Sequence, residues 1–291
     1  MKKLLLAVFL ISVSLFSLNL VQATEVNIGV MASRGNLKAL KRWTDIGKYL
    51  SAETGVKIKI VPLKPNKTIQ AISAGKVSYM LANPVLTVAM EEKLATTPLL
   101  TMKKKSGAQF AGVIFAKKGN AINKAADLKG KKVMGYKFKR SAAAYVFQVK
   151  HLMDKGINAH KDFSVFKEAK GQDDIVLAVQ AGTFDAGFVK SGLLETMAKE
   201  GKINLADFVI IDQKKDSLAA LHSTQLYPQW YLSATSKADN VLSSKIKAAL
   251  LKLGADNKAS KKAKIVGFVE PLSLDELKMT LRALKLPPYN S

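Results

Sequence analysis

Basic and hydroxyl side chains gather in one short stretch of the sequence. Lys137, Lys139, Arg140 and Ser141 directly follow a strand predicted over residues 132–136. A helix is predicted to begin at Ser141, and the free N–H groups and dipole of a helix N-terminus stabilise an anion. The guanidinium of Arg140 suits two oxygens of an oxyanion, and the lysines add point charges. The stretch predicts an oxyanion clamp; the alternative is an exposed basic loop in which Ser141 only caps the helix.

A second group of candidates follows two other predicted strands. Ser33 and Arg34 come after a strand over residues 26–30, and Asn83 comes after one over residues 79–82. Because the carboxyl ends of parallel strands share one edge of a sheet, these side chains should face the same cleft. Asn83 could equally be a turn residue, held in an extended shape by the proline that follows it.

Two further candidates are Lys190 and Tyr227. Lys190 follows a strand predicted over residues 185–189 and would approach the cleft from the other half of the chain, although a single lysine is more often solvated. Tyr227 could form a wall of the cleft together with Trp230. An aromatic residue next to Pro228 could equally pack in a hinge.

The usual signatures of catalysis are missing. His151, His160 and His222 are isolated, without the HExxH spacing of a zinc site, and the sequence has no GxSxG, P-loop or GxGxxG motif. Cysteine is absent, which removes disulfides, thiolate metal sites and a lipid-modified cysteine. We therefore expect a binding protein that is not an enzyme and needs no cofactor or metal.

Strands and helices alternate along the chain, which is typical of an α/β fold with parallel sheets. This alternation occurs twice along the chain, and no low-complexity linker separates the two halves. This predicts two lobes, each a mostly parallel sheet flanked by helices, with the ligand cleft between them. We expect residues 24–112 and 228–291 to form lobe 1 and residues 113–227 to form lobe 2. Helices predicted over 243–254 and 274–284 should pack against the first lobe.

Residues 1–23 have the pattern of a cleavable signal peptide. Two lysines precede an apolar run over residues 4–18, and small residues suited to a signal peptidase place the mature start at Thr24. The apolar run is shorter than the roughly 20 residues that a membrane-spanning helix needs. We expect export to the periplasm without a lipid anchor.

The chain is strongly basic, with 46 Lys and Arg residues against 22 Asp and Glu residues and a net charge of +24. Such a field attracts anions. Nucleic acid is the weakest partner, because the lysines are scattered and no interleaved aromatic pattern suits base stacking. A small oxyanion, an anionic envelope surface and plain solubility remain as explanations of the charge.

Several segments spread along the chain carry a resemblance to one known protein family. Residues 29–84, which begin GVMASRG and end MLANP, look like the N-terminal lobe of that family. The segments GVIFA at 112–116, AADLKGK at 125–131 and AGTFDAG at 181–187 are similar to its second lobe. Together these segments resemble the phosphate-, phosphite- and phosphonate-type periplasmic solute-binding proteins of ABC importers. The resemblance implies the type II periplasmic binding protein fold, a monomer, and delivery of a small oxyanion to an ABC permease.

Two features depart from a plain phosphonate binder. The segment STQLYPQW at 223–230 is similar to periplasmic sensor modules of two-component kinases that respond to sulfur oxyanions such as tetrathionate or thiosulfate. The clamp stretch reads KFKRSAAAY at 137–145 where the family has an acidic-Pro-x-Ser-Thr-Ser-Gly loop, so an aminoalkyl phosphonate is in doubt. The alternatives are thus an accessory protein for a sensor kinase, or a basic module that interacts with the envelope surface.

Overall fold

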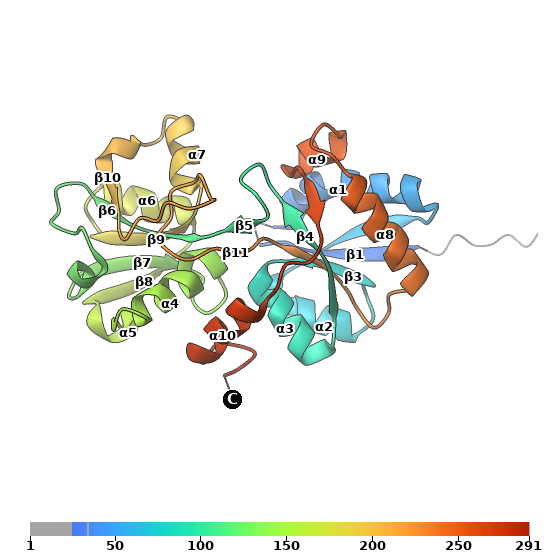
Figure 1. Ribbon diagram of the computed structural model, residues 1–291, viewed down its shortest axis with the longest axis horizontal. Helices are drawn as coiled ribbons and strands as arrows, with labels where there is room; N and C mark the ends of the chain where they lie inside the picture. Colours follow the sequence, from blue (N-terminus) through green and yellow to red (C-terminus); the bar gives the residue numbers. More distant parts are fainter. Residues whose placement is uncertain (1–24, 34, 291) are drawn as a thin grey trace, which may run out of the picture.

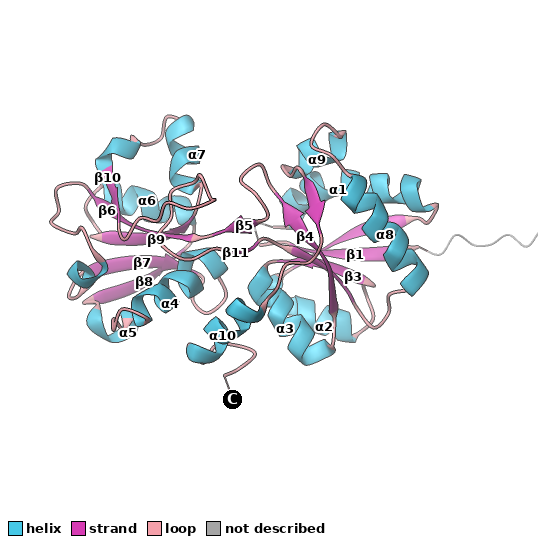
Figure 2. Ribbon diagram, in the orientation of Figure 1, coloured by secondary structure: helices cyan, strands magenta, loops and turns pink. Residues whose placement is uncertain are grey.

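The computed structural model describes residues 25–33 and 35–290, so the predicted signal peptide lies outside the described residues. The chain forms two β-sheets, each flanked by helices, which lie side by side and are joined by thin crossing segments (Figure 1). Figure 2 shows the same arrangement, with the two groups of strands separated along the long axis of the molecule. This is the two-lobed α/β architecture that the sequence predicts.

The first sheet combines strands from both ends of the chain. β1 pairs in parallel with β2 and β3, whereas β12 runs antiparallel to β3 and β4. Hence β1, β2, β3 and β4 point in one direction, and their carboxyl ends share one edge. From edge to edge the strands are β13 (Gly267–Val269), β4 (Thr97–Lys103), β12 (Tyr231–Ala234), β3 (Tyr79–Ala82), β1 (Val26–Met31) and β2 (Ile58–Leu63).

The second sheet is built from the middle of the chain. β7 is parallel to β8 and β9, and β6 is antiparallel to β9 and β10. The carboxyl ends of β7, β8 and β9 therefore share an edge, as in the first sheet. The order is β10 (Phe208–Ile210), β6 (Gly112–Lys117), β9 (Ala186–Lys190), β7 (Lys132–Tyr136) and β8 (Val165–Ala169).

A two-stranded ribbon connects the lobes. β5 (Gln109–Phe110) leads from the first sheet into the second, and β11 (Tyr227–Pro228) leads back, with the two strands paired antiparallel. In Figure 1 this ribbon lies between the two sheets. The parallel strand ends that carry the candidate residues are thus brought toward one another by two short passages of chain.

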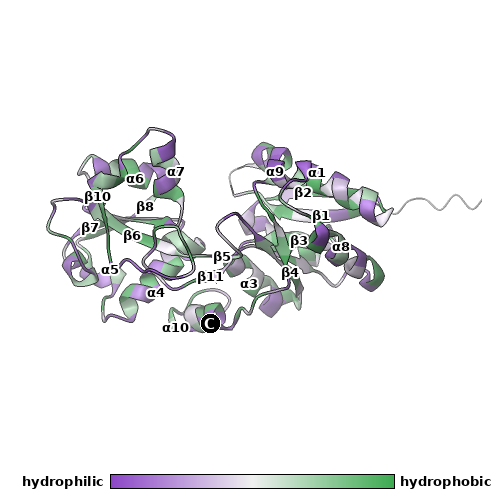
Figure 3. Cartoon of the chain, turned by 45° about the horizontal axis from the view of Figure 1, so that its top comes forward, coloured by the Kyte–Doolittle hydropathy of each residue, from purple (hydrophilic) through white to green (hydrophobic). Residues whose placement is uncertain are grey.

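Amphipathic helices cover the sheets because their apolar residues recur every three or four positions. In α1 (Asn36–Thr54), Trp43, Ile46 and Leu50 are buried, and the helix ends at Gly55 with φ 72°, where glycine is favoured. Figure 3 shows hydrophobic residues along the strands and hydrophilic ones on the outer helices. The other helices are α2 (Thr68–Ser73), α3 (Pro84–Leu94), α4 (Phe147–Met153), α5 (Ala159–Asp162), α6 (Gln172–Gln180), α7 (Leu193–Lys199), α8 (Asn240–Lys252), α9 (Lys258–Ala263) and α10 (Asp275–Ala283).

The last helix, α10, bridges the two lobes. It contacts α3 of the first lobe and α4 of the second, whereas the sequence predicted packing against the first lobe alone. Val88 on α3, Phe147 on α4 and Leu277 on α10 belong to one buried hydrophobic cluster. An ion pair of 2.6 Å between Lys278 and Glu91 adds a polar link to α3. Among the described residues, no helix combines the length and apolar character needed to cross a membrane.

Candidate functional site

The loop after β7 holds its cations in a tight turn. The backbone N–H groups of Arg140 and Ser141 both donate to the carbonyl oxygen of Lys137, at 3.0 and 2.9 Å. Lys137 and Lys139 have positive φ values of 43° and 66°, a region that L-residues other than Asn and Asp rarely occupy. Such strained residues persist where the surroundings impose them, and they cluster at functional sites.

Phe138 anchors this loop to the second lobe. Its ring lies 4.3 Å from that of Phe166 and 4.7 Å from that of Tyr145, measured between centroids. Its backbone N–H donates to a carboxylate oxygen of Glu168 at 2.8 Å. Because the aromatic residue points inward, its neighbours Lys137 and Lys139 are left on the outer side of the turn. Sequence reasoning missed both anchors, since Phe166 and Glu168 come from a different strand.

The helix after the loop does not begin as the regular helix predicted from Ser141. Residues Ala142–Val146 form a π-helical turn before α4, and Ala143 and Ala144 have non-helical backbone angles. Ser141 is the N-cap residue, yet its side chain makes no capping hydrogen bond. Its hydroxyl is therefore available to a ligand. The alternative, in which Ser141 only caps the helix, lacks the hydrogen bond that such a cap would make. Single π-turns are frequent at functional sites.

A buried glutamine fixes the shape of this turn. The side-chain amide of Gln148 donates to the carbonyl oxygens of Ala143, Val113 and Val189, at 2.9, 3.2 and 3.0 Å. The side chain is fully buried, and a Cβ at Gly112 would lie only 2.5 Å from it. Gln148 thus ties the non-helical turn to β6 and β9. No sequence motif marked it.

The first lobe approaches the same loop. The ammonium group of Lys137 donates to the carbonyl oxygen of Ser33 at 3.2 Å, which joins the ends of β7 and β1 across the lobes. Asn83 lies at the end of β3, next to β1 in the sheet, and its Oδ1 accepts the N–H of Leu86 as the N-cap of α3. Its amide nitrogen is the group left for a ligand. Arg34 lies outside the described residues.

The other predicted residues lie in two different places. Lys190 is half-buried at the end of β9, and its backbone N–H donates to Gln172. It therefore shares the edge with the loop after β7. Tyr227 is buried in the crossing strand, with its ring stacked on Phe147 at a centroid distance of 3.8 Å and its hydroxyl 3.0 Å from that of Thr280. These contacts agree with hinge packing.

Protonation of two histidines should make the fold less stable in acid. Burial lowers the pKa of His151 and of His160 from the usual 6.5, and nearby Lys139 lowers that of His160 further. Below pH 6.5 the folded protein then binds fewer protons than the unfolded chain, so acidification favours unfolding.

We expect the melting temperature to fall as the pH is lowered from about 7.5 to about 5, and to fall less in His160→Gln and in His151→Gln. Differential scanning calorimetry at constant ionic strength measures this. A melting temperature that rises on acidification in this range contradicts the assignment of two neutral histidines.

Residues 25–33 and 35–290 contain no cluster of His, Cys, Asp and Glu side chains that could hold a metal ion. What the two facing edges offer instead is a set of cations, hydroxyl groups and backbone N–H groups. Such donors suit an anion rich in oxygen atoms.

Comparisons with known proteins agree with this chemistry. A family model described as the phosphonate periplasmic substrate-binding protein of ABC transporters matches residues 28–275. The tetrathionate sensor histidine kinase of Salmonella typhimurium is 28% identical over 230 residues, which are 77% of this chain. The chain spans 39% of the length of that kinase.

Two solved structures share the fold. A Xanthomonas citri protein bound to ATP superimposes with a TM-score of 0.74 at 15% identity, and covers 90% of this chain and 98% of its own. The PhnD1 protein of Prochlorococcus marinus, in complex with methylphosphonate, gives a TM-score of 0.68 at 14% identity with the same coverage. With the family match over most of its length, this chain belongs to the periplasmic phosphonate substrate-binding proteins of ABC transporters.

Proposed function

We propose that the protein captures a small oxyanion of the phosphate, phosphite or phosphonate type in the cleft between its lobes, delivers it to an ABC permease, and catalyses no reaction. The observation that carries the proposal is the contact of Lys137 with Ser33, because it brings the basic loop of the second lobe to the strand end of the first. A ligand placed there would touch both lobes.

In this proposal Arg140, Lys139 and the hydroxyl of Ser141 bind the oxyanion from the second lobe, together with free N–H groups of the turn after Ser141. Ser33, Arg34 and Asn83 bind it from the first lobe. A ligand stabilises the closed form only by binding that form better than the open one, which requires residues from both lobes. Lys137 and Lys190 then set the positive potential of the cleft.

The lobes that close would be residues 24–112 with 228–291, and residues 113–227. We place the protein in the periplasm as a monomer, exported by cleavage of residues 1–23. The family is one of periplasmic transport components, which supports this location and an inner-membrane permease as partner.

A second candidate is an accessory protein that reports a sulfur oxyanion to a two-component sensor kinase. The similarity to the tetrathionate sensor kinase over 77% of this chain favours it. Both candidates use the same cleft, and they differ in the ligand and in the partner that recognises the closed form. Surface adhesion through the basic charge differs from both, since it should collapse as ionic strength rises.

A thermal-shift screen distinguishes these functions. A ligand that binds only the native state at a hundred times its Kd adds about 2.7 kcal/mol of stability, which corresponds to roughly 5–10 °C in a domain of this size. We expect one shift of that order among phosphate, phosphite, methylphosphonate, sulfate, thiosulfate and tetrathionate, with sodium chloride at equal ionic strength as control. A phosphorus oxyanion supports transport, and a sulfur oxyanion supports the sensor role. No shift with any of the six contradicts the clamp.

A further inference from the structure

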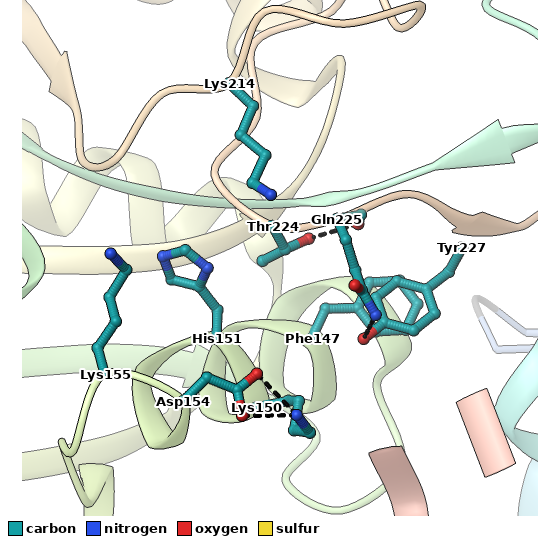
Figure 4. A pocket seen from close by; sticks show the side chains of 9 residues that line it. All are labelled: Phe147, Lys150, His151, Asp154, Lys155, Lys214, Thr224, Gln225 and Tyr227. Carbon is teal, nitrogen blue, oxygen red and sulfur yellow. Dashed lines mark hydrogen bonds and ion pairs between the residues drawn. The ribbon is translucent and has the colours of Figure 1, made fainter. Parts of the chain in front are cut away.

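A pocket of about 230 Å³ lies on the second lobe beside the segment that returns to the first lobe (Figure 4). Its walls come from α4 and the two residues that follow it, from Lys214, and from Thr224, Gln225 and Tyr227. The basic loop after β7 contributes nothing to it, and of the candidate residues of the cleft Tyr227 alone lines it. The volume exceeds what one water occupies, roughly 30 Å³, so a small ion with part of its hydration fits.

Lysines outnumber carboxylates among the side chains that line this pocket. Lys150 is bound by both carboxylate oxygens of Asp154, at 2.6 and 2.7 Å, and Lys155 lies 3.4 Å from Asp212. Lys214 forms no ion pair with any residue in the described part of the chain. Among the lining side chains, three lysines face the single carboxylate of Asp154. Lys214 is thus the lining lysine with no carboxylate within ion-pair distance in the described part of the chain.

The side chains in Figure 4 converge on the space between α4 and the returning segment. Lys214 extends from its own loop toward Thr224, and Lys150 approaches from the opposite wall. The imidazole of His151 lies beside Lys155 and is held by Asp212, with 2.8 Å between Nε2 and the carboxylate oxygen. Burial lowers the pKa of His151, so the lysines supply the positive charge at neutral pH.

The remaining wall is hydrogen-bonded to elements that connect both lobes. Gln225 donates to the hydroxyl of Tyr227 at 2.9 Å and to Glu276 of α10 at 3.3 Å. Because α10 also contacts α3, an occupant of the pocket would touch the segment that joins the lobes.

We propose that this pocket is a second binding site, separate from the cleft, for a tetrahedral dianion such as inorganic phosphate or the phosphate end of a monoester. Lys214 provides the free ammonium group, and Lys150 and Lys155 turn partly from their carboxylates to the ligand. A dianion suits the site because it can be shared by two or more ammonium groups. Thr224 and Gln225 border it with polar side chains.

The histidines allow the two sites to be observed separately. The chain has 3 histidines. His151 lines the pocket, and His160 hydrogen-bonds Tyr145 under the cleft loop. We would follow the ring signals of both by proton–carbon NMR while titrating the protein with inorganic phosphate, and separately with glycerol 3-phosphate, at constant ionic strength. We expect a saturable shift at His151 and a rise of its pKa, because a dianion beside the ring favours the imidazolium.

Two matched substitutions show whether the NMR shift at His151 arises from binding in the pocket. Lys214→Ala should weaken the apparent affinity at His151 at least fivefold and leave any response at His160 unchanged, whereas Lys215→Ala, which removes the same charge one residue away, should change neither. The tighter of the two probes identifies free phosphate or a monoester as the source. A shift at His151 that does not saturate, or one that persists in Lys214→Ala, overturns the second site. Neither result bears on the cleft, which the thermal-shift screen and His160 report.

Discussion

The double substitution Arg140→Ala and Ser141→Ala is expected to lower the affinity for the oxyanion by about a hundredfold or more. Each hydrogen bond to a charged group is worth roughly 1.5–3 kcal/mol, and about 1.4 kcal/mol corresponds to a factor of ten in Kd. Arg140 is exposed and Ser141 is half-buried, so neither side chain forms part of the core. Isothermal titration calorimetry with the ligand found in the screen measures the loss.

The fold of the double variant should stay intact, because Arg140 is exposed and Ser141 makes no capping bond. Its melting temperature without ligand should therefore remain close to that of the unmodified protein. Lys118→Ala removes an exposed cation at the far end of β6 and serves as the control, with no expected change in affinity. Equal losses of affinity for the oxyanion in the control and the double variant would mean that only the overall charge attracts the ligand.

Gln148→Leu is expected to reduce both stability and ligand binding. Three buried carbonyl groups each lose the hydrogen bond from Gln148, and a typical hydrogen bond contributes roughly 0.5–1.5 kcal/mol. Removal of the buried Oε1, which has no hydrogen-bond partner, offsets part of this loss, so we expect a decrease of about 1–3 kcal/mol in the free energy of unfolding. Released from Gln148, Ala143 can relax toward regular helix, which moves the N–H groups after Ser141 and should weaken binding about tenfold.

Urea unfolding and calorimetry test this expectation together. Gln70→Leu makes the same chemical change at an exposed position of α2, where the free energy of unfolding should change by less than about 0.5 kcal/mol. An unchanged affinity in a destabilised Gln148→Leu protein would show that Gln148 supports the core without shaping the turn.

The elements of the fold were largely predictable because their signals are local. Short apolar runs placed β1, β3, β7 and β9 within about two residues of their ends. β4 and β13 were missed, since strands of this kind are defined by partners far away in the sequence rather than by their own pattern. α3 was missed too, although an asparagine cap and a proline at its first turn are the usual start signal.

The cations of the candidate site can be recognised in the sequence, whereas the residues that hold the loop in place cannot. The basic loop stands out in the sequence, and the order of strands places it at a sheet edge. The aromatic packing of Phe138, the carboxylate of Glu168 and the amide of Gln148 depend on which strands become neighbours. The pocket lined by Lys214 and His151 lies between segments more than 60 residues apart, and no motif links them.

The double passage of the chain through β5 and β11 also sets an order of folding. The second sheet consists of one continuous stretch, whereas the first sheet pairs β3 and β4 with β12, which comes after that whole stretch. Contacts of high sequence separation form slowly, because the entropy of closing the loop is lost before they are made. When the chain emerges N-terminus first, β3 and β4 therefore keep unpaired edges until β12 has been made and can pair with them. During this period the protein is most exposed to aggregation and proteolysis.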